Sequence, residues 1–184
     1  GSSQILELAG EFTGRDTGPD ILILTVLKER EVQVRAMLGK NYRGFHLFDD
    51  ELCLQVPKDH PLTQRSFIPM KELSGLPMLL YSGTPNRMTD SELILRQRGY
   101  PLDNVSRTAN LDTTSQVAVK MNRFCFVGFP SVEFRPMTNV EYIPLEEPIL
   151  SEFILLVKRS VKNMPFADSL TERLDGTFSM YEMW

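Results

Sequence analysis

Two groups of hydroxyl-bearing residues lie where a sheet protein would bind a small anion. Ser82-Gly83-Thr84 follows a short strand candidate at Met78–Tyr81, and Asp112-Thr113-Thr114-Ser115 follows another at Val105–Ala109. Each group precedes a segment with helical features, and the first N–H groups of a helix lack partners within it. If the two groups converge, they suit a carboxylate. The alternative, equally open for any single residue, is that these hydroxyls only cap helices.

The segments around these groups predict an α/β fold. Amphipathic spacing predicts a helix over Glu29–Leu38, and Thr89 with Glu92 forms a capping box for a helix that stops at Gly99. Asp112 or Thr113 is expected to cap a third helix. Buried strands are predicted at Ile21–Val26, Leu52–Val56, Met78–Tyr81, Val105–Ala109, Phe124–Phe129, Val140–Pro144 and Glu152–Val157.

Further helices are predicted at Ile5–Phe12 and at 165–174. Strands and helices therefore alternate along the chain, which favours mainly parallel sheets. In open α/β sheets, ligands bind beyond the carboxyl ends of the strands. This rule favours the binding interpretation of the two hydroxyl groups.

Other reactive residue types do not predict an enzyme, a metal site or a cofactor. His46 and His60 are the only histidines, neither has a cysteine or carboxylate at metal-ligand spacing, and His60 is expected in a structural turn. The acidic run at 49–51 is interpreted as a solvated turn. Cys53 and Cys125 are expected to be buried, unpaired thiols, with a disulfide between them or redox sensing by Cys125 as the alternatives. No phosphate loop or nucleophile elbow is present.

Length and charge bound the class of protein. With 184 residues and 42% apolar content, the chain can form one ordinary domain or two small ones. The net charge of −4 comes from 24 acidic and 20 basic residues that are mixed along the chain, so no basic stripe for nucleic acid is expected. No apolar stretch is long enough for a membrane span. Residues 1–3 are interpreted as a tag scar, and a cytoplasmic location is expected.

A family resemblance rests on the order of several segments. Leu52–Leu62, with the sequence LCLQVPKDHPL, resembles a strand and HPL motif of the effector-binding domain of LysR-type transcriptional regulators. The order that follows also resembles this family: Ile68–Leu73, the strand Leu76–Leu80, a helix, a strand, the hydroxyl-rich helix start, a strand ending at Pro130, then Val140–Leu145 and Phe153–Lys158. The resemblance covers residues 5 to 174.

The resemblance implies an α/β fold with two Rossmann-like subdomains joined by crossover strands, similar to type 2 periplasmic binding proteins. Subdomain I would comprise 4–75 and 146–184, and subdomain II would comprise 76–145. A small, anionic effector would bind between them. The N-terminal winged helix-turn-helix of the family is absent from this chain. The interval between Leu38 and Leu52 is shorter than the family pattern and is expected to lack a strand and loop.

Site residues follow from the resemblance by position. Ser82, Gly83 and Thr84 match the ligand-contacting loop, and Thr113, Thr114 and Ser115 match the helix start that faces it. Phe129, before Pro130, matches one wall of the pocket. Arg87 is a candidate for a charge-assisted bond to a carboxylate, with a solvated surface arginine as the alternative.

The resulting hypothesis is a ligand-sensing regulatory domain that is not an enzyme. Its expected partners are a small-molecule effector and further copies of itself, in a homodimer or higher homo-oligomer. DNA would be contacted only through the missing N-terminal domain, and a membrane is not expected. The alternatives are a free solute-binding protein of the same bilobal fold and a small α/β enzyme that uses the same cleft.

Overall fold

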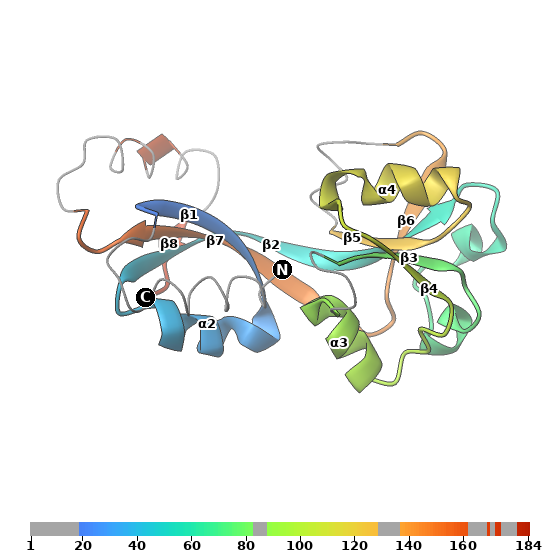
Figure 1. The fold of residues 1–184 in the computed structure, drawn as a ribbon, viewed down its shortest axis with the longest axis horizontal. Coiled ribbons are helices and arrows are strands. Elements are labelled where there is room, and N and C mark those ends of the chain that lie inside the picture. The colour runs from blue at the N-terminus through green and yellow to red at the C-terminus, as the bar shows by residue number, and fades with distance from the viewer. Residues whose placement is uncertain (1–18, 83–87, 129–136, 162–168, 170–171, 174–179) are drawn as a thin grey trace. The chain divides into compact units, whose positions relative to one another are not determined.

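The computed structural model describes residues 19–82, 88–128, 137–161, 169, 172–173 and 180–184 (Figure 1). The chain divides into two compact units: unit 1 comprises Gly1–Asp49 and Ser151–Trp184, and unit 2 comprises Asp50–Leu150. The chain passes between them within a long strand, β2 (Tyr42–Pro57), and at the start of β7 (Leu150–Lys158). Within the described part of the chain, no helix is long and apolar enough to cross a membrane.

Unit 1 contains a sheet, and an α-helix packs against this sheet within the described residues. The strand β1 (Ile21–Leu27) pairs antiparallel with β7, which lies next to β2, and β8 (Tyr181–Glu182) also pairs with β2. After a short 3-10 turn, α2 (Glu31–Leu38) packs on this sheet. One buried cluster of unit 1 consists of Leu24, Val26, Val34, Leu38, Tyr42, Ile154, Leu156 and Trp184, and a second consists of Leu47, Leu155 and Val157.

Unit 2 is built on the second half of β2. This part of β2 pairs antiparallel with β5 (Cys125–Gly128) and β6 (Val140–Pro144). Beside them, β3 (Met78–Tyr81) and β4 (Val105–Thr108) form a parallel ladder. In Figure 1, α4 (Leu111–Lys120) lies above these strands and α3 (Asp90–Gln97) lies below them. The face of α4 that carries Val117 and Ala118 packs on Leu79 and Cys125.

The expectation of mainly parallel sheets is wrong. β1 pairs antiparallel with β7, and β5, β6 and β8 all pair antiparallel with β2. A helical crossover makes parallel only the two strands that it connects, whether or not they lie side by side. Here β7, from late in the chain, lies between β1 and β2. The sequence order therefore does not determine the strand directions.

The extent of β2 also differs from the sequence prediction. The strand was expected at Leu52–Val56, but it begins at Tyr42 and includes the acidic run, in which Asp50 is buried. Residues 49–51 are therefore not a solvated turn. The expectation that the interval between Leu38 and Leu52 lacks a strand is therefore wrong, because β2 occupies it from Tyr42 onward.

The other predicted elements fall into two groups. Those at β1, β3 to β7 and α2 to α4 are confirmed within a few residues of their predicted bounds. The helix predicted at Ile5–Phe12 lies outside the described residues, as does most of the one predicted at 165–174. The predicted subdomain II begins at 76 and ends at 145, whereas unit 2 spans Asp50–Leu150. The subdomain boundaries remain a prediction.

Candidate ligand-binding site

The two hydroxyl groups follow adjacent parallel strands of unit 2. Tyr81, the last residue of β3, lies opposite Thr108, the last residue of β4. The N–H of Ser82 extends this ladder by donating to the carbonyl of Thr108 at 2.8 Å. α4 begins three residues after β4, at Leu111. Ser82 and the start of α4 therefore lie at the same edge of the β3–β4 sheet, the edge at which open α/β sheets bind ligands.

Asn110 caps α4. Its Oδ1 accepts a hydrogen bond from the N–H of Thr113 at 3.2 Å, and its own N–H donates to Oγ1 of Thr108 at 3.4 Å. The predicted cap, Asp112 or Thr113, is therefore wrong, and the cap lies two or three residues earlier. Asparagine is among the preferred caps, but only Thr113 and Gln116 match the capping-box pattern.

Two of the three hydroxyls in the second group have structural partners. Oγ1 of Thr114 donates to the carbonyl of Asn110 at 2.7 Å, which ties the first turn of α4 to its cap. Oγ of Ser115 donates to Oε1 of Gln55 and lies 3.3 Å from Sδ of Met137. In return, Nε2 of Gln55 donates to the carbonyl of Ser115 at 3.0 Å. These two hydroxyls hold α4 in place.

Thr113 differs from Thr114 and Ser115. Its N–H is capped, but its hydroxyl makes no hydrogen bond to any described residue. Its side chain is half-buried at the first turn of α4. Among the described residues, Thr114 and Ser115 have side-chain hydrogen-bond partners and the hydroxyl of Thr113 has none.

Of the five remaining predicted site residues, the structure describes one. Ser82 is buried and directly follows β3. Gly83, Thr84, Arg87 and Phe129 lie outside the described residues.

A buried ion-pair cluster connects α3 to β4. Glu92, on α3, receives two hydrogen bonds from Arg107 at 2.6 and 2.8 Å and one from Arg96 at 3.1 Å. Burial alone would raise the pKa of Glu92, but the bonds from Arg107 and then Arg96 outweigh it and hold the pKa below its usual value. Thr89 caps α3 by accepting from the N–H of Glu92, as the capping box predicts. The carboxylate of Glu92 instead fixes α3 to β4.

Both thiols are buried and unpaired, as expected. Burial raises the pKa of Cys125 to about 12, and burial, then the nearby charges of Glu51 and Asp50, raise the pKa of Cys53 to about 12. A thiol that stays protonated is a poor nucleophile. This supports an inert rather than a redox-sensing Cys125.

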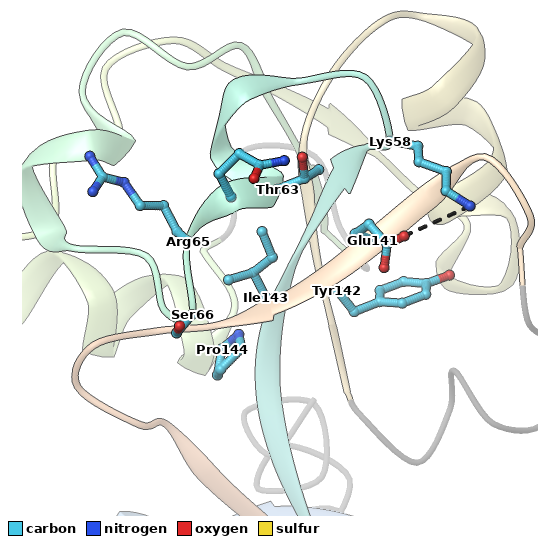
Figure 2. Close-up of a pocket in the computed structure, with 9 residues that line it drawn as sticks. Lys58, Thr63, Arg65, Ser66, Glu141, Tyr142, Ile143 and Pro144 are labelled. Atoms are coloured by element: carbon cyan, nitrogen blue, oxygen red, sulfur yellow. Dashed lines mark ion pairs between the residues drawn. The ribbon is translucent and has the colours of Figure 1, made fainter.

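Unit 2 also has an open pocket of about 410 Å³, which contains none of the predicted ligand residues (Figure 2). It is lined by Lys58, Thr63, Gln64, Arg65, Ser66, Glu141, Tyr142, Ile143 and Pro144. Its cations are already compensated, because Lys58 lies 4.0 Å from Glu141 and Arg65 lies 2.6 Å from Glu72. The pocket therefore offers little to attract an anion. Nearby, His60 accepts from the N–H of Leu62, which confirms it as a turn residue.

Gln55 is the residue of this site that the sequence did not identify. It is only 1% exposed, although the amide group is polar. The signal was present, because Gln55 is the one polar side chain in the apolar run Leu52–Val56. A buried amide needs partners, and a hydroxyl-rich helix start supplies them.

The fold is that of an α/β protein, and comparisons with known proteins give the family. A family model for the LysR substrate binding domain matches residues 33–178, so the chain belongs to this family. No curated protein matches the chain at the sequence level. The type 2 periplasmic-binding-protein-like fold predicted from the sequence is thereby confirmed.

Solved structures agree with the family. The effector binding domain of a BenM variant is similar with a TM-score of 0.66 and 17% identity, covering 95% of this chain and 76% of that one. The regulatory domain of Synechocystis PCC6803 CcmR, in complex with 2-PG, has a TM-score of 0.66 and 13% identity, covering 94% and 78%. The reduced OxyR regulatory domain from Pseudomonas aeruginosa has a TM-score of 0.62 and 14% identity, covering 94% and 76%. The chain spans 48% of full-length BenM.

Proposed function

We propose that this chain is the sensor domain of a LysR-type regulator and binds a small anion at the ends of β3 and β4. The observation that carries this proposal is Thr113, whose hydroxyl makes no hydrogen bond to any described residue at the first turn of α4. Ser82 follows the neighbouring strand. A carboxylate or phosphate placed here would accept bonds from hydroxyls and helix N–H groups and would gain from the helix dipole.

The relatives support an anionic ligand. One solved structure is of the BenM effector binding domain with its effector benzoate, which is a carboxylate. Another is of the CcmR regulatory domain in complex with 2-PG. The loop residues Gly83, Thr84 and Arg87, and Phe129 beyond β5, are proposed as further contacts by their position in the sequence.

The proposed mechanism is a population shift in a cytoplasmic homo-oligomer. The effector binds one arrangement of the subunits better than another and so changes the oligomer that a separate N-terminal domain presents to DNA. The effector is released unchanged, since no catalytic step is proposed. Conversion of a bound ligand to product would contradict this part of the proposal.

A thermal-shift screen tests the site directly. The ligands are aromatic acids including benzoate, amino acids and sugar phosphates. A ligand at 100 times its dissociation constant should add about 2.7 kcal/mol to the free energy of unfolding. Thr113→Ala removes one hydrogen bond to a charged group, worth about 1.5–3 kcal/mol, so affinity should fall about tenfold or more.

Thr138→Ala is the matched control, because it removes the same hydroxyl from an exposed position elsewhere in unit 2. Affinity in this variant should be unchanged. If Thr113→Ala folds normally and binds a hit as tightly as the unmodified chain, the site is misplaced.

A further inference from the structure

Unit 1 contains a cluster of three groups that can ligate a metal. One ring nitrogen of His46 and one oxygen each of Asp49 and Glu152 all lie within 4.8 Å of one another. His46 and Asp49 come from β2, and Glu152 comes from β7. The sequence prediction that neither histidine has a carboxylate in ligand position is wrong for His46. Residues three apart in a regular strand face opposite sides, yet Nε2 of His46 lies 3.1 Å from Oδ1 of Asp49.

Glu152 is the unusual member of the cluster. Glu152 is only 4% exposed, and its Oε1 is buried with no hydrogen-bond partner among the described residues. Burial, and then repulsion from Glu31, raise the pKa of Glu152 above its usual value. An isolated carboxylate is costly to bury, and buried carboxylates are normally paired with a cation or coordinated to a metal.

His46 has a second buried polar atom at the same place. Its Nδ1 is also buried without a hydrogen-bond partner in the described part of the chain. The ring is held in position by Tyr181, which stacks on it with the ring centroids 4.7 Å apart and the planes at 17°. Tyr181 lies opposite His46 in the β2–β8 ladder, so the backbone sets this stacking. The imidazole is therefore oriented before any ligand binds.

Lys28 neutralises Asp49, the exposed carboxylate of the cluster. Its Nζ lies 3.0 Å from Oδ1 of Asp49, and its side chain is 43% exposed. A flexible, hydrated ammonium at the surface can leave Asp49 when a stronger cation arrives. Lys28 thus pairs with Asp49, and Oε1 of Glu152 still has no hydrogen-bond partner in the described part of unit 1.

We propose that His46, Asp49 and Glu152 form a binding site for a divalent transition-metal ion. Ligand bonds of about 2.0–2.2 Å place the donor atoms around one zinc ion about 3–4 Å apart. The 4.8 Å cluster needs only a small movement, which the exposed side chain of Asp49 can make. An imidazole with carboxylates favours zinc or a similar ion over magnesium and calcium. Three protein ligands leave a further position for water.

The test is calorimetric titration of the full 184-residue chain with zinc chloride in a buffer that does not chelate metals. The unmodified chain should show one saturable site, and magnesium chloride should bind about tenfold more weakly or worse. Glu152→Gln keeps the shape of the side chain and should weaken zinc binding about tenfold or more. Glu141→Gln is the matched control: the same change at an exposed carboxylate of unit 2 should leave zinc binding unchanged.

Two further variants keep the outcome decisive. Asp49→Asn changes an exposed side chain, so it should fold normally even if Glu152→Gln does not, and it should also weaken zinc binding. Lys28→Gln should strengthen zinc binding, because Lys28 competes for Asp49. The proposal is overturned by the absence of a saturable zinc site, by equal binding of magnesium, or by folded Asp49→Asn protein that binds zinc as tightly as the unmodified chain.

Discussion

Gln55 and Ser115 hydrogen-bond to each other twice, and so fix the first turns of α4 against β2. The hydroxyl of Ser115 donates to the amide oxygen of Gln55, and the amide nitrogen of Gln55 donates to the carbonyl of Ser115 at 3.0 Å. The amide is buried, so these bonds are its alternative to water. The pair sets the position of α4, and therefore of Thr113, relative to the sheet of unit 2.

Ser115→Ala is expected to destabilise unit 2 by about 1–3 kcal/mol, because the oxygen of the buried Gln55 amide loses its donor. Gln55→Met removes the amide altogether and should cost less than Ser115→Ala. The double variant should cost less than the sum of the two, because the two residues interact directly. Urea unfolding followed by far-UV circular dichroism gives all three values. Thr113→Ala is the control and should change stability by only about 0.5 kcal/mol or less.

The fluorescence of Trp184 is expected to report on the packing of unit 1. Trp184 is the only tryptophan, it is 9% exposed, and it packs with the core of unit 1. Its carbonyl accepts from the N–H of Gly44 at 2.7 Å, and a Cβ at Gly44 would lie 2.6 Å from Cε2 of its ring. Gly44→Ala should therefore displace the ring, shift its emission to the red and destabilise unit 1 by about 1–3 kcal/mol.

Gly75→Ala provides the comparison for this fluorescence measurement. Gly75 has a φ of +75° and no atom within 4 Å of an added Cβ, so the substitution strains the backbone of unit 2 without a clash. It should lower stability and leave the native emission of Trp184 unchanged. A red shift in Gly75→Ala, or none in Gly44→Ala, would contradict the assignment of Trp184 to unit 1.

The sequence predicted elements better than it predicted their pairing. Apolar runs and capping residues located β3, α3 and β4 because these signals are local. The direction of β1 beside β7 depends on a strand from the far end of the chain, which no local pattern encodes. Similarly, Thr113 and Ser115 share one sequence cluster, and only the structure shows that Ser115 is bonded to Gln55. The proximity of His46, Asp49 and Glu152 is likewise a tertiary feature.

Cys53 and Cys125 are expected to resist alkylation in the native protein. With each pKa raised to about 12, the thiolate is about one part in ten thousand at pH 8, and burial restricts access as well. Mass spectrometry after treatment with iodoacetamide should find both thiols unmodified in the folded chain and modified in urea. Rapid modification of Cys125 in the folded chain would revive the redox-sensing alternative.

Glu92 is expected to make the stability of unit 2 sensitive to acid. Its pKa in the folded state is below the ordinary value of 4.5, because the hydrogen bonds from Arg107 and Arg96 outweigh the effect of burial. The folded state therefore holds the proton less tightly than the unfolded state does. The stabilisation is fully present well above pH 4.5 and is lost as the pH falls toward the folded-state pKa.

Glu92→Gln should remove this pH dependence. At pH 7 it should cost about 1–3 kcal/mol, less than for a fully buried pair, because Arg107 and Arg96 are 28% and 39% exposed. The difference from the unmodified chain should shrink below pH 4.5, where Glu92 begins to lose its charge in the unfolded state. Urea midpoints measured from pH 3 to pH 7 test this. Glu141→Gln, at an exposed carboxylate, is the control and should show the same urea midpoints as the unmodified chain at every pH. If the urea midpoints of Glu92→Gln change with pH just as those of the unmodified chain do, Arg107 and Arg96 do not stabilise the fold through the charge of Glu92.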